Sequence, residues 1–420
     1  MYNRSTKFER RSVKKCKSWP SYFGSYISLI SPTASINRFL GFLPYKLKAS
    51  KLVYSKSYSV FSTISIIIYL SCASLALYEM NFVSENFLTV TSKLHFNLIL
   101  CCGPMIFIMN YVKSRSMIRV MNRVSNVSRI LPSEIFCGVA TRILIKDTLF
   151  LILLVSSMPH IIYLYRNNIF GYTCWYTFFG VIALISLYTN NVYVLNACFK
   201  YINDSLVQVK EILVNDEPHL LRRVYHMQKN PILLTKLRTL KKQHLEMSEV
   251  VQLLNSTCSM QIEATFTIMV IDITFNMYNH LILFNEVGKM RSFSFALIFA
   301  ILHTVHVIIT VSIVETTRSQ MTKIGSSVHR ILVHTFDDQV TTELELFSLQ
   351  VLQKGNVFVM KGLIIDATLL TKVIGYWIKR NEVFLSTLVT DGVRHYYIFV
   401  NISAVLTRRV LLKKNSWVNG

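Results

Sequence analysis

The chain has 420 residues, of which 52% are hydrophobic and only 16% are charged. This composition excludes a single soluble domain, because so much apolar surface requires contact with lipid. The formal net charge of +23 could serve a nucleic-acid partner, but the basic residues fall between apolar runs, so no nucleic acid is expected to bind. The eight cysteines show no C-x-x-C pair and no metal-ligand spacing, which predicts free, mostly buried thiols and no metal site.

Apolar runs of membrane-spanning length dominate the chain after residue 56. Residues 1–56 are polar and basic, so no cleavable signal peptide is expected. A spanning helix needs about 20 mostly apolar residues. Six runs meet this requirement, at residues 57–78, 94–112, 148–165, 171–198, 264–284 and 292–314. A seventh run, at residues 362–378, is near the short limit, and the sequence therefore predicts an all-α, polytopic membrane protein with seven transmembrane helices.

The distribution of Lys and Arg between these runs predicts the orientation of the chain. The segment before the first run and the five loops that follow carry 12, 0, 7, 1, 9 and 2 of these residues, the loops being 81–92, 113–147, 166–170, 199–263 and 285–291. Because cytoplasmic loops carry the excess of positive charge, the basic N-terminus is expected in the cytoplasm. With seven helices the C-terminus is then outside, which is the opposite of a G-protein-coupled receptor.

The interval 199–263 is predicted to form a cytoplasmic helical insert. Seven of its residues recur at alternating spacings of three and four, as in a coiled-coil seam: Leu237, Leu240, His244, Met247, Val251, Leu254 and Cys258. This stripe is expected to be buried, either against its own neighbours or in a cytoplasmic anchor bundle of the extended fourth to sixth helices and segment 341–357. Residues 316–361 are expected to form a cytoplasmic loop and the anchor helix, with the polar run 316–343 as a connection.

The stretch Leu346–Gly375 reads LFSLQVLQKGNVFVMKGLIIDATLLTKVIG, which predicts a helix, a break and a second helix that enters the membrane. The order FSLQ-V-LQ, VF, GL-I-ID-A-TLL and V-IG resembles the C-terminal signature of insect gustatory receptors. The resemblance implies a homo- or heterotetrameric cation channel in the plasma membrane of sensory neurons, opened by a small tastant, whose last helix lines the pore. It implies no requirement for a nucleotide, a metal or a G protein.

The seventh run carries the candidates for a pore lining. Four of its residues share one helical face: Ile365, Thr368, Leu369 and Lys372. In a symmetric oligomer such a face can ring a pore, and the alternative is that this helix only packs among the others. The resemblance stops after Gly375, and the tail 379–420 carries seven Lys or Arg on the side expected to be outside. We therefore interpret the tail as a gene-model artefact or, alternatively, as a divergent terminus.

No catalytic motif occurs, so no enzymatic activity is expected. The outer halves of the predicted helices combine aromatic rings with a few polar groups, as a small-molecule pocket requires. The candidates for the ligand site are His160, Tyr163, Trp175, Tyr176, Asp272, Asn276 and His280. Asp272 is central because a carboxylate inside an apolar helix is costly, and Asn276 and His280 share its face.

Two alternatives remain open for these residues and two for the chain. The aromatic rings are also typical of a membrane-interface belt, and Asp272 is also placed to make a hydrogen bond between helices, for instance to His160 or His303. The rival functions are a seven-helix receptor coupled to G proteins and a small transporter. A transporter would show an internal repeat of helices, which the sequence does not show.

Overall fold

The computed structural model describes residues 24–83, 90–164, 169–215, 231–283, 290–333, 335, 337–354, 359–360 and 363–364. These residues form eight α-helices: α1 (Tyr26–Phe39), α2 (Lys56–Tyr78), α3 (Val90–Val127), α4 (Ser133–Leu164), α5 (Ile169–Asn215), α6 (Pro231–Leu283), α7 (Met290–Val333) and α8 (Asp338–Gln353). The shorter elements are the π-helix η2 (Glu79–Val83), the 3₁₀ helix η3 (Ser128–Ile130) and the strands β1 (Tyr45–Lys48), β2 (Lys51–Tyr54), β3 (Val359–Met360) and β4 (Leu363–Ile364). The fold is therefore almost entirely helical.

The helices α2 to α7 contain the six apolar runs predicted before residue 315, one run to each helix. Only residues 165 and 284 of these runs lie outside the described part. Within the described residues, five stretches are long and apolar enough to cross a membrane: Lys56–Val83, Thr91–Ile130, Ile169–Leu213, Pro231–Asn276 and Phe299–Val333. Large apolar side chains on α2 and α4 stay exposed, among them Ile68 and Ile152, as contact with lipid requires. The chain is an all-α, polytopic membrane protein.

The helix α5 is the centre of the membrane part, since it packs against α1, α2, α3, α4, α6 and α7. Its close approach to α3 depends on small residues. A Cβ atom on Gly103 of α3 would lie 2.6 Å from Cγ2 of Thr177 on α5 and 2.6 Å from the hydroxyl oxygen of Tyr69 on α2. Glycine at this position therefore allows three helices to meet without a clash.

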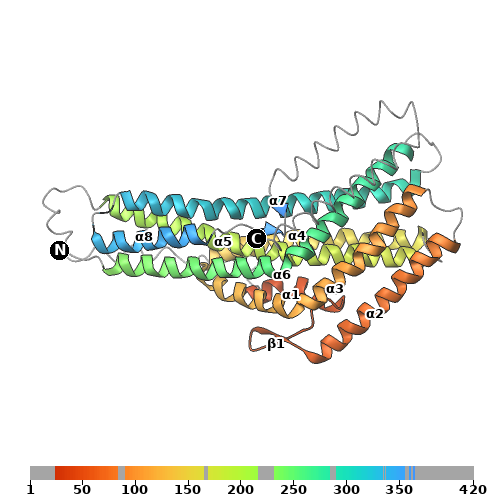
Figure 1. Ribbon diagram of the computed structural model, residues 1–420, viewed down its shortest axis with the longest axis horizontal. Coiled ribbons are helices and arrows are strands. Elements are labelled where there is room, and N and C mark those ends of the chain that lie inside the picture. The colour runs from red at the N-terminus through yellow and green to blue at the C-terminus, as the bar shows by residue number, and fades with distance from the viewer. Residues whose placement is uncertain are drawn as a thin grey trace, which may run out of the picture.

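The helices α5, α6 and α7 continue far beyond their apolar runs, and α8 lies beside these extensions (Figure 1). We call the assembly of residues 199–215, 231–263, 315–333 and 338–353 the stem bundle. All seven residues of the predicted seam are buried, each with at most 4% of its surface exposed. Phe347 and Gln350 of α8 both contact His244 in this seam, so the stripe packs against α8 as well as against its nearer neighbours.

Two expectations for the segment after residue 315 are wrong. The run 316–343 is not simply a connection, because α7 continues to Val333 and α8 begins at Asp338. The helix continues because a buried stripe persists at spacings of three and four, through Met321, Ile324, Val328 and Ile331. Leu363 and Ile364, expected in the first turn of the seventh helix, form β4 and pair antiparallel with β3. The β-branched Val359 and Ile364 face each other there and favour extended backbone.

The remainder of the predicted seventh helix, together with the pore candidates Ile365, Thr368, Leu369 and Lys372, lies outside the described residues, as does the tail 379–420.

The N-terminal region contains ordered elements that its polar composition concealed. The helix α1 packs on α5, where the hydroxyl of Tyr26 donates to Oδ1 of Asn191 (2.6 Å) and Nδ2 of Asn37 donates to the carbonyl of Ala183 (3.1 Å). Most of its buried residues recur at helical spacing: Tyr26, Leu29, Ile30, Thr33, Ala34 and Asn37, with Ile27 also buried. A template for spanning helices misses this element because it has only 14 residues.

The cysteines do not all follow the expectation of free thiols. Six in the described part are free: Cys72, Cys101, Cys102, Cys174, Cys198 and Cys258. The last three of these are buried, whereas Cys101 is exposed. Cys137 on α4 is disulfide-bonded, so the prediction is wrong at that position.

Candidate functional site

A buried carboxylate lies between two histidines in the membrane part of the fold. Asp272 on α6 receives two contacts, one from Nε2 of His95 on α3 (3.2 Å to Oδ1) and one from Nδ1 of His303 on α7 (2.7 Å to Oδ2). All three residues are at most 1% exposed. A carboxylate in such surroundings is tolerated only when it is paired, and here both of its oxygens have partners. We call these three residues the His95–Asp272–His303 cluster.

The cluster leaves two ring nitrogens facing the interior without a partner. Because a carboxylate accepts hydrogen bonds, the network assigns a proton to Nε2 of His95 and to Nδ1 of His303. The opposite atoms, Nδ1 of His95 and Nε2 of His303, are buried and have no hydrogen-bond partner among the described residues. In neutral imidazoles these two atoms are acceptors. The site therefore offers acceptors to a hydroxyl or an amine donor.

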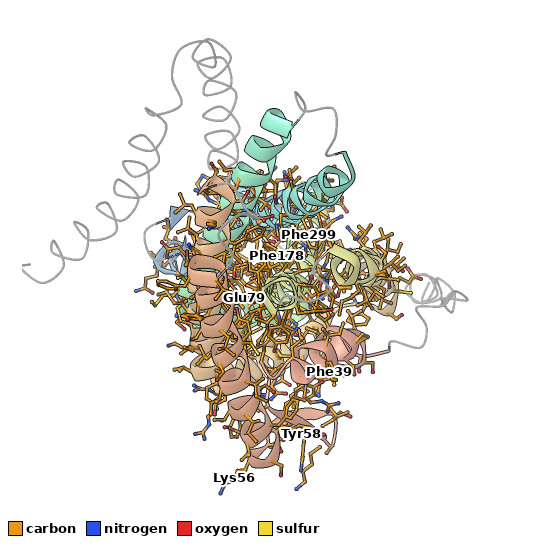
Figure 2. The ribbon with its side chains drawn as sticks, turned by 90° about the vertical axis from the view of Figure 1, so that its right-hand side faces the viewer. Phe39, Lys56, Tyr58, Glu79, Phe178 and Phe299 are labelled. Carbon is orange, nitrogen blue, oxygen red and sulfur yellow. The ribbon has the colours of Figure 1, made fainter. Side chains whose placement is uncertain are left out.

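Aromatic rings from three helices lie around the cluster. The ring of Phe275 on α6 stacks on His95, with centroids 4.9 Å apart and an interplanar angle of 8°. Phe178 on α5 lies 5.2 Å from the ring of His303 and 5.3 Å from Phe299 on α7. Figure 2 shows Phe178 and Phe299 beside each other in the interior of the molecule. Rings supply apolar area while a few polar atoms fix orientation, which is the chemistry of a small-molecule site.

Asp272, one of the three candidates on α6, belongs to this cluster, but it also satisfies the alternative interpretation. Asp272 makes the hydrogen bond to His303 that was considered for it, so it joins helices whether or not a ligand binds. Asn276, one turn further along, is also buried. The side chains of His160, Tyr163 and His280 lie outside the described part of the chain. His95 was not selected from the sequence, although a histidine in an apolar run is itself a signal for a polar partner.

The two candidates on α5 point away from the cluster. Nε1 of Trp175 donates to Oγ of Ser157 on α4 (3.1 Å). The hydroxyl of Tyr176 donates to the carbonyl of Leu40 (2.7 Å), and its ring packs 5.2 Å from that of Tyr69 on α2. Successive helical residues diverge by about 100°, so neighbours in sequence face different helices. Phe178 is the residue of this run that contacts the cluster.

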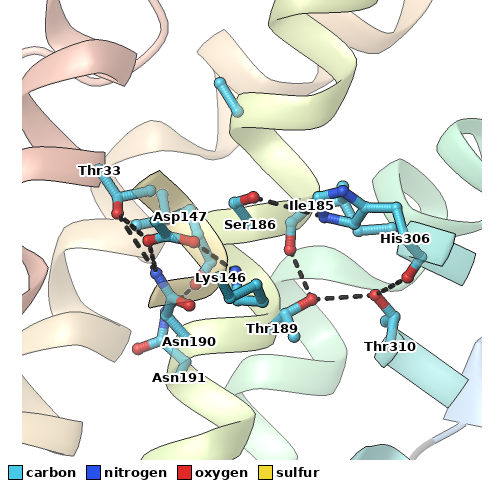
Figure 3. A network of polar contacts seen from close by, with 12 residues as sticks. Thr33, Lys146, Asp147, Ile185, Ser186, Thr189, Asn190, Asn191, His306 and Thr310 are labelled. Atoms are coloured by element: carbon cyan, nitrogen blue, oxygen red, sulfur yellow. Dashed lines mark hydrogen bonds and ion pairs between the residues drawn. The ribbon is translucent and has the colours of Figure 1, made fainter. Parts of the chain in front are cut away.

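A second buried polar network joins α1, α4 and α5 (Figure 3). Asp147 on α4 accepts from Thr33 Oγ1 (2.6 Å) and from Asn190 Nδ2 (2.7 Å), and it pairs with Lys146. Sequence reasoning missed this network because its members come from helices far apart in the chain. Its neutral groups can act as hydrogen-bonding contacts that hold α1, α4 and α5 together.

The same region extends to α7 through two further contacts. Oγ of Ser186 lies 3.3 Å from Nε2 of His306, and Oγ1 of Thr189 lies 3.1 Å from Oγ1 of Thr310. The ring of Phe150 packs 4.1 Å from that of His306. His306 thus acts as a packing group between helices. This network differs from the cluster in that it extends across four helices and includes a lysine.

The spanning helices, the stem bundle and the buried cluster define a helical, polytopic membrane protein. The family model described as "7tm Chemosensory receptor" matches residues 30–378, so the chain belongs to the seven-transmembrane chemosensory receptor family. As a member of a receptor family it is not an enzyme. The resemblance of Leu346–Gly375 to gustatory receptors is confirmed at the level of the chemosensory receptor family, whose match includes this stretch.

Solved structures of an insect olfactory receptor have a similar fold. One is the insect olfactory receptor OR5 from Machilis hrabei, with 13% sequence identity and a TM-score of 0.58, covering 86% of this chain and 99% of that chain. The structure of that receptor in complex with eugenol has 11% identity, the same TM-score of 0.58 and the same coverage of 86% and 99%. No curated protein sequence matches this chain. At such low identities the likeness concerns the fold.

Proposed function

We propose that the chain is a gustatory receptor, a subunit of a non-selective cation channel that opens when a small tastant binds. Membership of the chemosensory receptor family and the C-terminal stretch Leu346–Gly375 support this assignment. The observation that carries it is the His95–Asp272–His303 cluster, because it combines buried acceptors with aromatic walls at the meeting point of four helices. The site of action is the plasma membrane of sensory neurons, where lipid surrounds the exposed faces of α2 and α4.

The proposed ligand is a small molecule with an apolar body and at least one hydrogen-bond donor. The donor meets Nδ1 of His95 or Nε2 of His303, while the body packs on Phe178, Phe275 and Phe299. The olfactory receptor of similar fold is known in complex with eugenol, a small molecule. His160, Tyr163, His280, Trp175 and Tyr176 stay candidates for other ligand contacts, with Asn276 on the wall of the cluster.

The proposed gating follows from differential affinity. Four subunits, identical or mixed with other gustatory receptors, assemble around the axis with the N-terminus in the cytoplasm. The seventh helix lines the pore with Ile365, Thr368, Leu369 and Lys372. A ligand that contacts α3, α5, α6 and α7 shifts the equilibrium toward the open state only if it binds the open state with higher affinity than the closed state. The geometry of the cluster suits this role because a ligand there would touch four helices at once.

The test is whole-cell current in cells that express the full chain, recorded during a panel of small alcohols, phenols and amines. Asp272→Asn keeps the shape of the side chain but removes the charge that aligns both rings. We expect its half-maximal ligand concentration to rise by about tenfold or more, since a lost charge-assisted hydrogen bond costs roughly 1.5–3 kcal/mol. The matched control is Asp204→Asn, the same change at an exposed position of α5.

Surface biotinylation separates a lost response from lost expression. A second variant, Phe178→Leu, keeps every hydrogen bond of the cluster and alters only the apolar wall, so it should change the ranking of ligands. An unchanged concentration dependence in both variants at normal surface levels would place the ligand elsewhere. Currents that never appear with any compound, at normal surface levels, would contradict the channel assignment for this chain on its own.

A further inference from the structure

The hairpin of β1 and β2 presents three lysines on one exposed face. The strands pair from Tyr45 opposite Tyr54 to Lys48 opposite Lys51, and the turn residues Ala49 and Ser50 both have positive φ, at 47° and 57°. Side chains alternate between the two faces of a strand. Lys46, Lys48 and Lys51 therefore share one face with Val53, and all four are exposed, whereas Tyr45 and Leu52 on the other face are buried.

Contacts with α3 fix which face of the hairpin points outward. Asn122 forms two hydrogen bonds with the backbone of Leu52, accepting from its N–H (3.0 Å) and donating to its carbonyl (2.7 Å). The guanidinium of Arg115 lies 4.4 Å from the centroid of the Tyr54 ring. These contacts hold the buried face on α3, so the three lysines are held away from the protein.

The positive charge around the hairpin has no acidic counterpart nearby in the sequence. No Asp or Glu occurs between residues 24 and 78. Lys48 lies directly opposite Lys51, and like charges in that position destabilise a hairpin. None of the ion pairs found in the described residues includes a hairpin lysine. An anionic partner outside the chain would offset this repulsion.

The guanidinium of Arg38 adds a further cation at the base of the hairpin. It lies 5.1 Å from the ring centroid of Tyr45 and 5.0 Å from that of Tyr58, while the ammonium of Lys46 lies 5.8 Å from the Tyr58 ring. Tyr58 belongs to α2, so the aromatic contacts connect the hairpin to the first spanning helix. The cations are thereby positioned at the end of that helix.

The position of the hairpin matches the headgroup level of a membrane. The helix α2 begins at Lys56, two residues after β2, and its exposed apolar side chains begin with Val60 and Phe61. Two large apolar side chains near the lysines also stay exposed, Phe39 at 78% and Val53, on the lysine face, at 44%. Figure 2 shows Phe39, Tyr58 and Lys56 toward the same outer end of the molecule. Basic residues mixed with apolar and aromatic ones are typical of an interfacial element.

We propose that this hairpin face, with Arg38, Lys46, Lys48, Lys51 and Lys56, binds anionic phospholipid headgroups in the leaflet where α2 enters the membrane. Positive charge alone would suit a soluble anion equally well. The exposed Phe39 and Val53 near it favour a bilayer, because apolar side chains gain from contact with acyl chains. This role requires neither ligand binding nor conduction, so it holds or fails separately from the proposed receptor function.

The test uses the full chain purified in mixed micelles of phosphatidylcholine with a minor fraction of phosphatidylserine. Mass spectrometry measures the ratio of the two lipids that stay bound after size-exclusion chromatography. We expect wild type to enrich phosphatidylserine by about threefold or more, and the triple variant Lys46→Gln/Lys48→Gln/Lys51→Gln to lose most of that enrichment. The matched control, Lys242→Gln/Lys323→Gln/Arg330→Gln, removes three exposed charges from the stem bundle and should keep it.

Three outcomes would overturn the proposal. In the first, the hairpin variant retains the wild-type enrichment of phosphatidylserine. In the second, the stem control loses as much enrichment as the hairpin variant, which would show a general effect of charge. In the third, excess soluble glycerophosphoserine abolishes the enrichment, which would show that the hairpin face binds free anions and not the bilayer. Thermal unfolding and elution volume verify folding, and Lys48→Gln alone, on the exposed turn, serves as a milder variant that should lose part of the enrichment if the triple variant misfolds.

Discussion

Two regions of the molecule bury histidines in opposite electrostatic settings. In the membrane part, His95 and His303 share the carboxylate of Asp272. In the stem bundle, Nδ1 of His244 accepts from Nε2 of Gln350 (3.0 Å), which also donates to the carbonyl of Lys241 (3.0 Å). The interior of the stem therefore uses neutral groups to align α8 on α6, whereas the membrane part keeps a charge in its interior.

The difference indicates what each region does. A neutral amide and a neutral imidazole fix the register of two helices at little electrostatic cost. A carboxylate between two imidazole rings is costly to bury, and an ionisable residue inside the membrane is typical of a functional site. We therefore expect the stem bundle to tolerate changes of polarity better than the cluster, and the predictions below test that contrast.

The largest effect is expected for Asp272→Ala. Removal of one partner of a buried pair leaves both rings without their acceptor and typically costs about 3–5 kcal/mol. Thermal unfolding of the detergent-solubilised protein should show a strongly lowered midpoint, with a smaller loss for Asp272→Asn. Asp204→Ala on the exposed face of α5 is the control and should change the midpoint little. Equal midpoints for Asp272→Ala and wild type would mean that the cluster does not stabilise the fold.

The second effect is a dependence of stem stability on pH. Burial lowers the pKa of His244 from its ordinary 6.5 to about 4, and this residue lies in the stem bundle, outside the apolar runs. Between these values the unfolded chain binds more protons than the folded one. Stability is thus complete above pH 6.5 and decreases as pH falls toward 4, by at most about 3 kcal/mol.

Hydrogen exchange of α8 at pH values from 7 to 4, corrected for the intrinsic rate, measures this dependence. His244→Gln should remove most of the slope, because the buried titrating group is gone. His329→Gln changes an exposed histidine of α7 and should leave the slope intact. A slope that persists in His244→Gln would assign the dependence to another group.

The third prediction compares the effect of Gly→Ala substitutions on stability in the membrane part and in the stem bundle. Gly103→Ala puts a methyl group 2.6 Å from Thr177 and Tyr69 and should destabilise the membrane part by about 1–3 kcal/mol. In Gly325→Ala in the stem, the new methyl group lies near only Cγ1 of Val351, at 3.4 Å. The higher helix propensity of alanine should therefore stabilise the stem by up to about 1 kcal/mol. Gly138→Ala on α4 has open space and serves as a second control. Similar unfolding midpoints for all three would show that the helices can separate to make room.

The smallest effect is expected for Glu343→Gln on α8. Its carboxylate accepts from Nζ of Lys241 (2.6 Å) and from Nε of Arg238 (2.7 Å), and these hydrogen bonds lower its pKa. Because Arg238 is largely exposed, solvent screens the pair, and the loss should stay below about 1 kcal/mol. The loss should also shrink at high salt. Glu345→Gln, an exposed change on the same helix, gives the baseline for hydrogen exchange, and a larger effect there than at Glu343 would contradict this assignment.

The candidate site shows how far residue types alone can lead. Asp272 was identified from the sequence because a carboxylate within an apolar run is rare and costly. Its partner His303 was considered, but His95 was not, since the pairing joins helices that are 177 residues apart in the chain. Trp175 and Tyr176 were chosen for their chemistry, while Phe178 makes the contact. Which of Trp175, Tyr176 and Phe178 faces the cluster depends on how α5 is rotated about its axis. That rotation is set by helix packing.

The sequence by itself determined that the chain is a polytopic helical membrane protein and where six of its apolar runs lie. It also determined that the seam from Leu237 to Cys258 is buried. These features follow from the free energy of transferring each residue out of water, which depends on local composition and period. They need no knowledge of which helices are neighbours.

The features that hydropathy does not predict were decided by the tertiary structure. It folded α1 against α5, extended α7 to Val333 and brought His95, Asp272 and His303 together. It also placed the lysine face of the hairpin beside the start of α2. Each of these features depends on contacts between residues far apart in the chain, where steric fit and hydrogen-bond geometry select one arrangement among many of similar hydropathy.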